Sequence, residues 1–272
     1  MWLIVNAGSS SLKLKVFDGQ QEVAKAFVAE IGADGHRAAM EHGLAEAGVP
    51  VAQLTAAAHR VVHGGAGLTA TCRITPEVQR QIEACVPLAP LHNPGNLVGI
   101  QSVTALASDL PQYAAFDTAF HASNPEVATT YALPLVERER GLRRYGFHGI
   151  SFAALVRVLR TRGELPERLL ACHLGNGCSL AAIVNGRSVA TTMGYSPLDG
   201  LTMGTRTGGI DGNAVLRLAE LHGIDRAGVI LNRESGLRGL GGASDMRSLH
   251  AAGTAEARFA VEHFVYWAVR HA

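Results

Sequence analysis

The feature that most constrains the fold of this chain is a weak internal repeat. When the sequence is shifted by 167 residues, Val5–Gly8 aligns with Cys172–Gly175 and Val16–Gly19 aligns with Ile183–Gly186. Each copy reads as a strand, a tight turn, a second strand and then Asp-Gly or Asn-Gly, which is a strong hairpin signal. The identity between the copies is thin, and a chance alignment is the alternative. Taken as a repeat, the pattern predicts two similar lobes that each open with three antiparallel strands.

Short apolar runs and longer helical patterns alternate along the chain, with glycine-rich turns between them. The runs that predict strands are Trp2–Val5, Leu12–Phe17, Leu169–Leu174 and Ser179–Val184, and those that predict helices are Asn96–Leu106, Ser151–Arg160 and Ala214–His222. This mixture is typical of an α/β fold. We expect a first lobe over residues 1–145 and a second over 146–272. From Thr254 onward the apolar spacing predicts a helix in which the chain stops, so that a covering segment would be missing.

Charge and composition exclude several classes of protein. Lysine and arginine total 24 against 23 acidic residues, and 47% of residues are apolar, which argues against disorder and against a broad nucleic-acid-binding face. The amino terminus has no basic segment before its short apolar run, and no stretch approaches a membrane span. The four cysteines form no Cys-x-x-Cys pair. We therefore expect a soluble cytoplasmic protein with no membrane partner and with buried, reduced thiols.

Two turns carry groups that suit phosphate oxygens. Asn6–Lys13 places three serine hydroxyls, successive backbone amides and one of only three lysines between two predicted strands. The glycine and lysine spacing is not that of a Walker A loop, and an ordinary hairpin turn is the alternative. The repeat makes His173–Ser179 its partner, so two phosphate-facing turns could oppose each other.

Two arginines stand in glycine-rich loops. Arg60 precedes Gly64 and Gly65, and Arg206 lies in the glycine-rich segment Gly204–Gly212. This setting suits a guanidinium aimed at an oxyanion. A surface arginine beside a flexible loop is the alternative for each. His59 and His63 are four residues apart, but the glycine pair ends any helix there and no acidic helix surrounds them, so zinc is disfavoured.

Two further candidates follow apolar runs. Asp117 comes at the end of a predicted strand, where ligands bind in open α/β sheets. His148 lies between Phe147 and Gly149, and from its position alone it suits a structural histidine as well as a catalytic one.

Seven motifs occur in a fixed order along the sequence, and together they are specific for one protein family. They are Asn6–Lys13, His59–Gly65, Ala89–Pro94, Phe116–His121, Arg144–Gly149, His173–Gly177 and Met203–Arg206. In this order they resemble the acetate kinases, with a match from Val5 to about Arg247. The resemblance implies the actin-like ATPase fold, related to ribonuclease H, in which two duplicated α/β lobes close a central cleft on a nucleotide. The second lobe would here be incomplete.

The resemblance also implies a role for residues in each motif. Arg60 and Arg206 would contact acetate and the transferring phosphoryl group, Asp117 would organise the acetate and metal region, and His148 would hydrogen-bond phosphoryl oxygens. The implied metal residue is Asn6; the implied nucleotide and phosphate residues are Ser9, Ser11, Lys13, His173, Asn176, Gly177, Asp245 and Arg247; the implied walls of the acetate pocket are Val62, Leu91, Phe147 and Pro197.

The implied reaction is the Mg²⁺- or Mn²⁺-dependent, reversible transfer of the ATP γ-phosphoryl group to acetate, which gives acetyl phosphate and ADP. Acetate is ionised at pH 7, so the nucleophile needs no general base, and Asp117 is not expected to accept a proton. The obstacle is repulsion between anions, which costs about 4 kcal/mol for one pair at about 4 Å and an effective dielectric of about 20. Two arginines, a histidine and a metal ion would offset that repulsion with positive charge and hydrogen bonds.

Departures from the family leave alternatives open. The family pattern has Thr-Ser-His after Phe-His-Gly, where this chain has Ile150, Ser151 and Phe152, and the acid and proline around Asp211 are here Gly209 and Gly212. The family also continues for roughly a further third, with a nucleotide loop and a final helix. A propionate or butyrate kinase, and a shortened nucleotide-binding protein without activity, are therefore alternatives. The resemblance further implies a homodimer through the second lobe.

Overall fold

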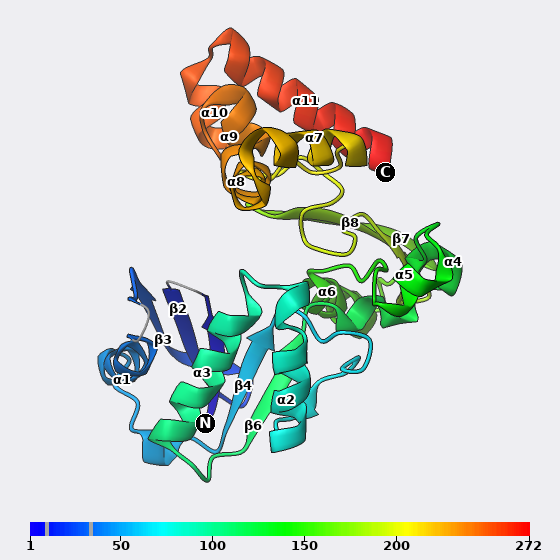
Figure 1. Cartoon of the computed structure of the whole chain (residues 1–272). Coiled ribbons are helices and arrows are strands. Elements are labelled where there is room, and N and C mark those ends of the chain that lie inside the picture. The colour runs from blue at the N-terminus through cyan, green and yellow to red at the C-terminus, as the bar shows by residue number, and fades with distance from the viewer. Residues whose placement is uncertain (9–10, 33–34) are drawn as a thin grey trace. The chain divides into compact units, whose positions relative to one another are not determined.

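The computed structural model describes residues 1–8, 11–32 and 35–272, which form two units, Met1–Ala122 and Ser123–Ala272 (Figure 1). In this described part of the chain, no helix is long and apolar enough to cross a membrane.

The first unit is built on a sheet of six strands. Its strands are β1 (Trp2–Ala7), β2 (Ser11–Asp18), β3 (Gln21–Ala29), β4 (Ala56–Val61), β5 (Cys72–Arg73) and β6 (Gln112–Phe116). Its helices are α1 (His36–Glu46), η1 (Val51–Gln53), α2 (Pro76–Ala84), η2 (Val86–Leu88) and α3 (Asn93–Leu106), and η3 (Ala119–Ser123) leads into the second unit.

The strand order β3-β2-β1-β4-β6-β5 places three parallel strands side by side. β1 pairs in parallel with β4, and β4 pairs in parallel with β6, so the carboxyl ends of these three strands meet at one edge of the sheet. Side chains alternate between the two faces of a strand, and Leu3, Val5 and Ala7 are buried in the core on the face that carries α1 and α3 (Figure 1). The opposite set on β1 includes Asn6.

The second unit contains a smaller sheet and a group of helices. Its strands are β7 (Arg168–Leu174), β8 (Cys178–Val184) and β9 (Arg187–Thr191). Its helices are α4 (Glu126–Thr129), α5 (Leu135–Glu139), α6 (Gly149–Thr161), α7 (Gly212–His222), α8 (Ile224–Val229), η4 (Ile230–Glu234), α9 (Gly236–Gly241), α10 (Met246–Ala252) and α11 (Ala255–His271).

Both units contain the three-stranded antiparallel arrangement that the repeat predicts, although α4, α5 and α6 precede it in the second unit. The pairings β1–β2 and β2–β3 in the first unit correspond to β7–β8 and β8–β9 in the second. The Asn-Gly turn also forms as predicted, because Asn185 (φ 51°) and Gly186 (φ 76°) both have the positive φ that a type I′ hairpin requires. The predicted strands and helices are thus confirmed, and each differs from the prediction only near its ends.

The division between the units falls after Ala122, earlier than the boundary expected after Tyr145. The intervening segment is bonded to the second unit. Thr130 and Arg143 form a β-bridge, and the backbone amide of Tyr145 donates to the carbonyl of Gly194 at 3.0 Å. Such pairing between distant segments carries no signal in sequence periodicity.

The final helix, α11, forms where the apolar spacing predicts it. Thr254 caps it by accepting a hydrogen bond from the amide of Ala257 at 3.1 Å. Ala257 and Ala260 pack with Leu237 and Leu249 in a core of their own.

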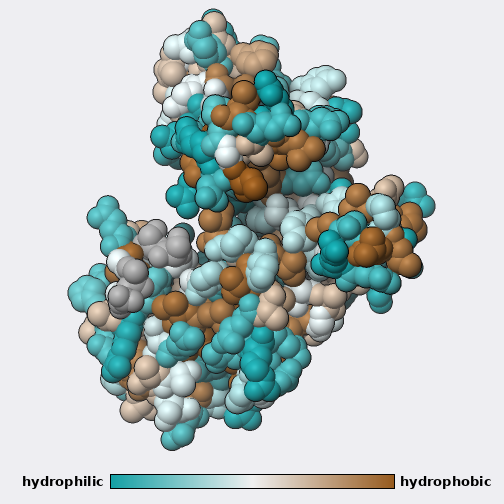
Figure 2. Space-filling view, in the orientation of Figure 1, coloured by the Kyte–Doolittle hydropathy of each residue, from teal (hydrophilic) through white to brown (hydrophobic). Residues whose placement is uncertain are grey.

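Apolar and polar residues are interspersed over the face of the molecule seen in Figure 2.

The prediction that the cysteines are buried is right for two of them and wrong for Cys172. All four are free thiols; Cys85 and Cys178 are buried, Cys72 is partly exposed and Cys172 is exposed. Cys172 is exposed while Ala171 before it is buried, because successive side chains of β7 point to opposite faces of the sheet.

Candidate active site

The first unit brings Asn6, Arg60 and Asp117 together at the carboxyl ends of β1, β4 and β6. The Arg60 guanidinium donates two hydrogen bonds to Oδ2 of Asp117, from Nε at 3.0 Å and from Nη2 at 2.6 Å. Its Nη1 donates to Oδ1 of Asn6 at 3.3 Å. The Asp117 side chain is only 4% exposed, whereas that of Arg60 is 39% exposed. The buried carboxylate therefore fixes the arginine while part of the guanidinium remains open to a ligand.

The loop after β4 is held by side chains from α3. Asn96 accepts a hydrogen bond from the amide of Val62 at 3.0 Å and donates to the carbonyl of Ala7 at 2.7 Å. Asn93 bonds both backbone groups of His63, at 3.1 and 3.0 Å. The motif around Pro94 thus supplies two buried amide side chains that tie β1, β4 and α3 together.

The first predicted phosphate turn is only partly described. Ser9 lies outside the described residues. The amide of Gly8 donates to the carbonyl of Ser11 at 2.8 Å, which closes the turn. Lys13 pairs in register with Asn6, so both side chains lie on the same face of the sheet, and the Lys13 ammonium lies 5.4 Å from the centre of the Phe27 ring.

The second predicted phosphate turn, between β7 and β8, is attached to the loop that carries Arg206. The carbonyl of Asn176 accepts a hydrogen bond from the amide of Gly204 at 3.0 Å. A Cβ at Gly204 would lie 2.1 Å from Oδ1 of Asn176, so only glycine permits this approach. The same loop is held from α9, because the amide of Leu237 donates to the carbonyl of Met203 at 2.9 Å.

Arg206 and His148 border the same point of that turn. A Cβ placed on Gly177 would lie 3.2 Å from Nε2 of His148 and 3.5 Å from Nη1 of Arg206. Nη1 of Arg206 also donates to the carbonyl of Pro197 at 3.0 Å. Four residues predicted for the site in the second unit, His148, Arg206, Gly177 and Pro197, are therefore neighbours.

His148 is the N-cap residue of α6 and has a left-handed backbone conformation (φ 59°). This conformation is uncommon for a residue with a side chain. Its Nδ1 lies 2.9 Å from Oγ of Ser179, and its ring stacks on that of His173 with centroids 4.0 Å apart. Nδ1 of His173 lies 3.0 Å from Oγ of Ser151. Phe152 is buried and meets the His173 ring edge-on, with the ring centroids 6.4 Å apart.

The remaining predicted residues are Asp245, Arg247 and the walls of the acetate pocket. Asp245 caps α10 and accepts hydrogen bonds from the amide and hydroxyl of Ser248, which lower the pKa of its carboxyl below the ordinary value. Arg247 follows it on the exposed surface. Among the predicted pocket walls, Val62 and Phe147 are buried, whereas Leu91 is 46% exposed.

His59 and His63, the pair considered for zinc, are both held neutral. Burial lowers the pKa of each to about 4. Nε2 of His59 bonds Gln112 at 2.8 Å, whereas Nδ1 of His63 accepts from the amide of Gly65 at 2.9 Å. Across residues 1–8, 11–32 and 35–272 there is no group of three or more His, Cys, Asp or Glu that could hold a metal ion.

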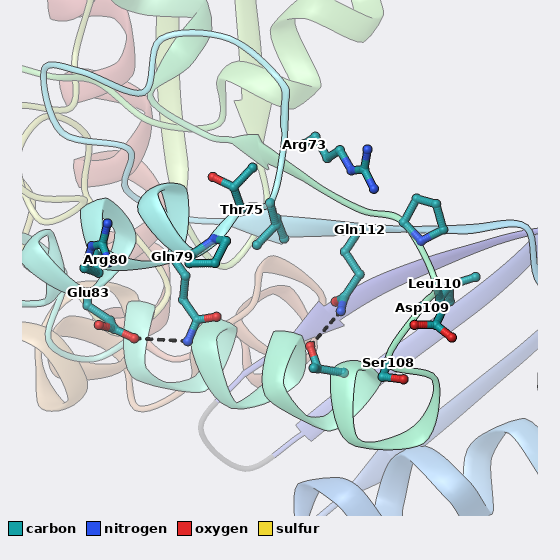
Figure 3. Close-up of a pocket in the computed structure, with 13 residues that line it drawn as sticks. Arg73, Thr75, Gln79, Arg80, Glu83, Ser108, Asp109, Leu110 and Gln112 are labelled. Carbon is teal, nitrogen blue, oxygen red and sulfur yellow. Dashed lines mark hydrogen bonds between the residues drawn. The ribbon is translucent and has the colours of Figure 1, made fainter.

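A polar pocket of about 650 Å³ lies elsewhere in the first unit, between α2, the end of α3 and the strands β5 and β6 (Figure 3). Gln112 lines it and donates to the Thr104 hydroxyl at 2.8 Å. Gln112 begins β6, whereas Asp117 follows its last residue, so the pocket is at the amino end of the strand and is separate from the candidate site.

Sequence reasoning missed three residues that hold the site, Asn93, Asn96 and Ser179. The two asparagines stand in a motif that was recognised as a whole, with no role given to their side chains. Their spacing of three places both on one face of α3, but the predicted helix begins only at Asn96 and leaves Asn93 outside it. Ser179 is the last residue of the second predicted phosphate turn, but the sequence gives no sign that its hydroxyl contacts His148.

Each unit thus presents an arginine near a glycine-containing turn at strand ends, Arg60 from the end of β4 and Arg206 from a loop, an arrangement typical of enzymes that act on phosphorylated substrates. A model of the acetokinase family matches residues 42–271. An acetate kinase from Synechococcus sp. (strain JA-2-3B'a(2-13)) is 42% identical over 97% of this chain and 76% of its own length. The chain belongs to the acetokinase family, and it is an enzyme, a kinase.

Solved structures agree with this assignment. The acetate kinase of Porphyromonas gingivalis superposes with a TM-score of 0.88 at 34% identity, over 98% of this chain and 77% of that one. A propionate kinase from Francisella tularensis superposes with a TM-score of 0.91 at 32% identity, over 99% of this chain and 78% of that one. The predicted α/β fold of the actin-like ATPase type is thereby confirmed.

Proposed function

We propose that this chain transfers the γ-phosphoryl group of ATP to acetate, reversibly, and so forms acetyl phosphate and ADP. Relatives named acetate kinase match it over most of its length. The observation that carries the proposal is the Arg60 guanidinium, which a buried carboxylate fixes at the carboxyl edge of the sheet while part of it stays open to solvent. An immobilised cation of this kind suits a small carboxylate that must approach a phosphoryl group.

The chemistry asks for charge and position, not for a base. Acetate is ionised at neutral pH, so no residue needs to remove a proton from it. Arg60 would bind the carboxylate, and Arg206 with His148 would donate to the phosphoryl oxygens. These donors are fixed before the reaction, by Asp117 and Asn6 in one unit and by Pro197 in the other, so they need little reorganisation as charge shifts.

The residues near Arg60 fit Mg²⁺ or Mn²⁺. Both hydrogen bonds from Arg60 to Asp117 fall on Oδ2, and no described residue donates to Oδ1. Oδ1 of Asp117 and the amide oxygen of Asn6 are hard donors, and Mg²⁺ is commonly held by one or two protein oxygens together with substrate phosphates and water. When bound, the ion would neutralise charge on the phosphates.

The nucleotide residues, the homodimer and a cytoplasmic location remain predictions. Ser11 and Lys13 in the first turn, and His173, Asn176 and Gly177 in the second, would face the ATP phosphates through hydroxyls, amides and one ammonium group. The segment with Asp245 and Arg247 would lie near the adenosine.

A second candidate is a propionate kinase, which the similarity to the Francisella tularensis structure favours. One methylene in an apolar pocket changes the free energy of binding by only about 1 to 3 kcal/mol, so the two activities can coexist in one site.

The test is to assay the purified chain with MgATP and acetate, propionate or butyrate, and to trap the acyl phosphate with hydroxylamine. We expect acyl hydroxamate with acetate at the highest kcat/KM, and loss of the product when the metal is chelated. The Arg206→Ala variant should lower kcat/KM by about 10²-fold or more. No acyl phosphate from any of the three acids, with the chain folded, would overturn the proposal, and a higher kcat/KM for propionate would move it to the second candidate.

A further inference from the structure

Three contacts fix the orientation of the His148 ring. Nδ1 lies 2.9 Å from Oγ of Ser179, the ring face lies on His173, and Nε2 borders Gly177 beside Arg206. Nε2 is thus the ring nitrogen on the side of Gly177 and Arg206, where we propose that the phosphoryl group binds. Whether Nε2 carries a proton decides whether His148 can donate there, because a neutral imidazole has one donor and one acceptor nitrogen.

Ser179 is on β8 and pairs in register with His173 on β7. Its exposure is 0%, so water does not reach it. Within the described part of the chain, the one hydrogen bond of its hydroxyl is the contact with Nδ1 of His148.

The direction of this hydrogen bond follows from the burial. If Nδ1 were protonated and donated to Ser179, the hydroxyl hydrogen would be buried without an acceptor, which costs about 1 to 3 kcal/mol. If Ser179 donates to Nδ1, its hydrogen is satisfied, and the ring proton must then be on Nε2. The second arrangement is the one in which the buried hydroxyl hydrogen of Ser179 has an acceptor.

We propose that Ser179 is a positioning residue whose buried hydroxyl donates to Nδ1 of His148 and so keeps the ring proton on Nε2, facing the transferring phosphoryl group. The inference rests on the proposed function for the role of the Nε2 proton, but the tautomer itself is a property of the free protein. Without the serine hydroxyl, the neutral ring would share its proton between the two nitrogens. In the tautomer with a lone pair on Nε2, the ring would repel a phosphoryl oxygen.

The tautomer can be measured without substrate. In the protein labelled with ¹⁵N-histidine, long-range ¹H–¹⁵N spectra distinguish a protonated ring nitrogen from an unprotonated one, and the His148→Gln variant assigns the signals. We expect an unprotonated Nδ1 and a protonated Nε2 for His148 at pH 8. A protonated Nδ1 in the wild-type protein would overturn the proposal whether or not the chain is a kinase.

Variants at Ser179 test the consequence for catalysis. Ser179→Ala should lower kcat about tenfold, the order of one hydrogen bond, with the KM for acetate and for ATP within about twofold. The His148 signals should change to those of a tautomer mixture. Ser179→Thr, which keeps the hydroxyl, should restore the wild-type tautomer and most of kcat.

Ser102→Ala is the matched control, because Ser102 is also buried but bonds only a carbonyl of its own helix, that of Val98 at 2.8 Å. It should leave kcat and the His148 signals unchanged. A Ser179→Ala enzyme with unchanged kcat, or one with weaker binding but an unchanged His148 spectrum, would show that the serine has only a packing role. If Ser179→Ala does not fold, the wild-type spectrum still decides the tautomer.

Discussion

The two units hold their candidate catalytic groups by different means. In the first, Arg60 is fixed by the charge of a buried carboxylate, and three parallel strands set the positions of Asn6, Arg60 and Asp117. In the second, His148 is held by a neutral hydroxyl and Arg206 bonds a backbone carbonyl, both beside a glycine turn. The difference suggests that charge is critical in the first unit, whereas exact fit is critical in the second.

The largest effect is expected from Arg60→Ala. The change removes the cation that we assign to the carboxylate substrate, and kcat/KM should fall by about 10²-fold or more. It also leaves Asp117 buried without its partner, so the free energy of unfolding should drop by a few kcal/mol, below the roughly 3 to 5 kcal/mol of a fully buried pair. Activity assays and urea denaturation measure the two effects.

The double variant Arg60→Ala/Asp117→Asn separates these effects. It removes the uncompensated charge as well, so we expect most of the stability to return while the activity stays low. If the free energy of unfolding does not recover, the single change does not act through the ion pair. Charge would then not be what distinguishes the first unit from the second.

In the second unit, Gly204→Ala should disrupt the fit. The added Cβ would lie 2.1 Å from Oδ1 of Asn176 and 2.7 Å from the carbonyl of Ser244. We expect kcat/KM to fall about tenfold and the free energy of unfolding to drop by about 1 to 3 kcal/mol, the range for overpacking. Gly212→Ala is the control, because a Cβ there meets nothing within 4 Å. Equal effects of the two alanines would contradict the role given to close packing.

A smaller effect, on stability, is expected from Asn96→Ala in the first unit. The buried amide of Val62 and the carbonyl of Ala7 would lose their partner, which should cost about 2 kcal/mol. Urea denaturation of this variant beside Asn213→Ala, a change at an exposed position, measures the difference. A loss below about 0.5 kcal/mol would show that the ends of β1 and β4 do not depend on the Asn96 side chain.

The smallest effect is a pH dependence from His59. Burial lowers its pKa to about 4 in the folded chain, from the ordinary value of 6.5. Its stabilising contribution is therefore complete above pH 6.5 and is lost as the pH falls toward 4, because only the unfolded chain takes up the proton in that range. Between pH 7 and pH 5.5 this loss is about 1 kcal/mol.

The His59→Gln variant should lack this part of the acid dependence. Denaturation curves at the two pH values, compared between variant and wild type, isolate it from the effects of the carboxyl groups. Parallel losses in both proteins would mean that His59 titrates alike in the folded and unfolded chains.

The strands, the repeat and the acid at the end of β6 could be predicted from the sequence because each depends on neighbours along the chain. Asp117 follows an apolar run, and the Asn-Gly turn has a composition of its own. Ser179 and Asn96 could not be assigned in this way, since their partners are 31 and 34 residues distant. The division after Ala122 has no local signal either, because Arg144 and Tyr145 bond Thr192 and Gly194 far along the chain.

The hydrogen bonds from the loop after β4 to Asn93 and Asn96 make hydrogen exchange a measure of local unfolding at this edge of the sheet. The backbone amides of Val62 and His63 donate to side chains of the first turn of α3. They can therefore exchange with deuterium only when that turn lifts off the sheet, and their exchange rates would gauge how often the edge that carries Arg60 comes apart.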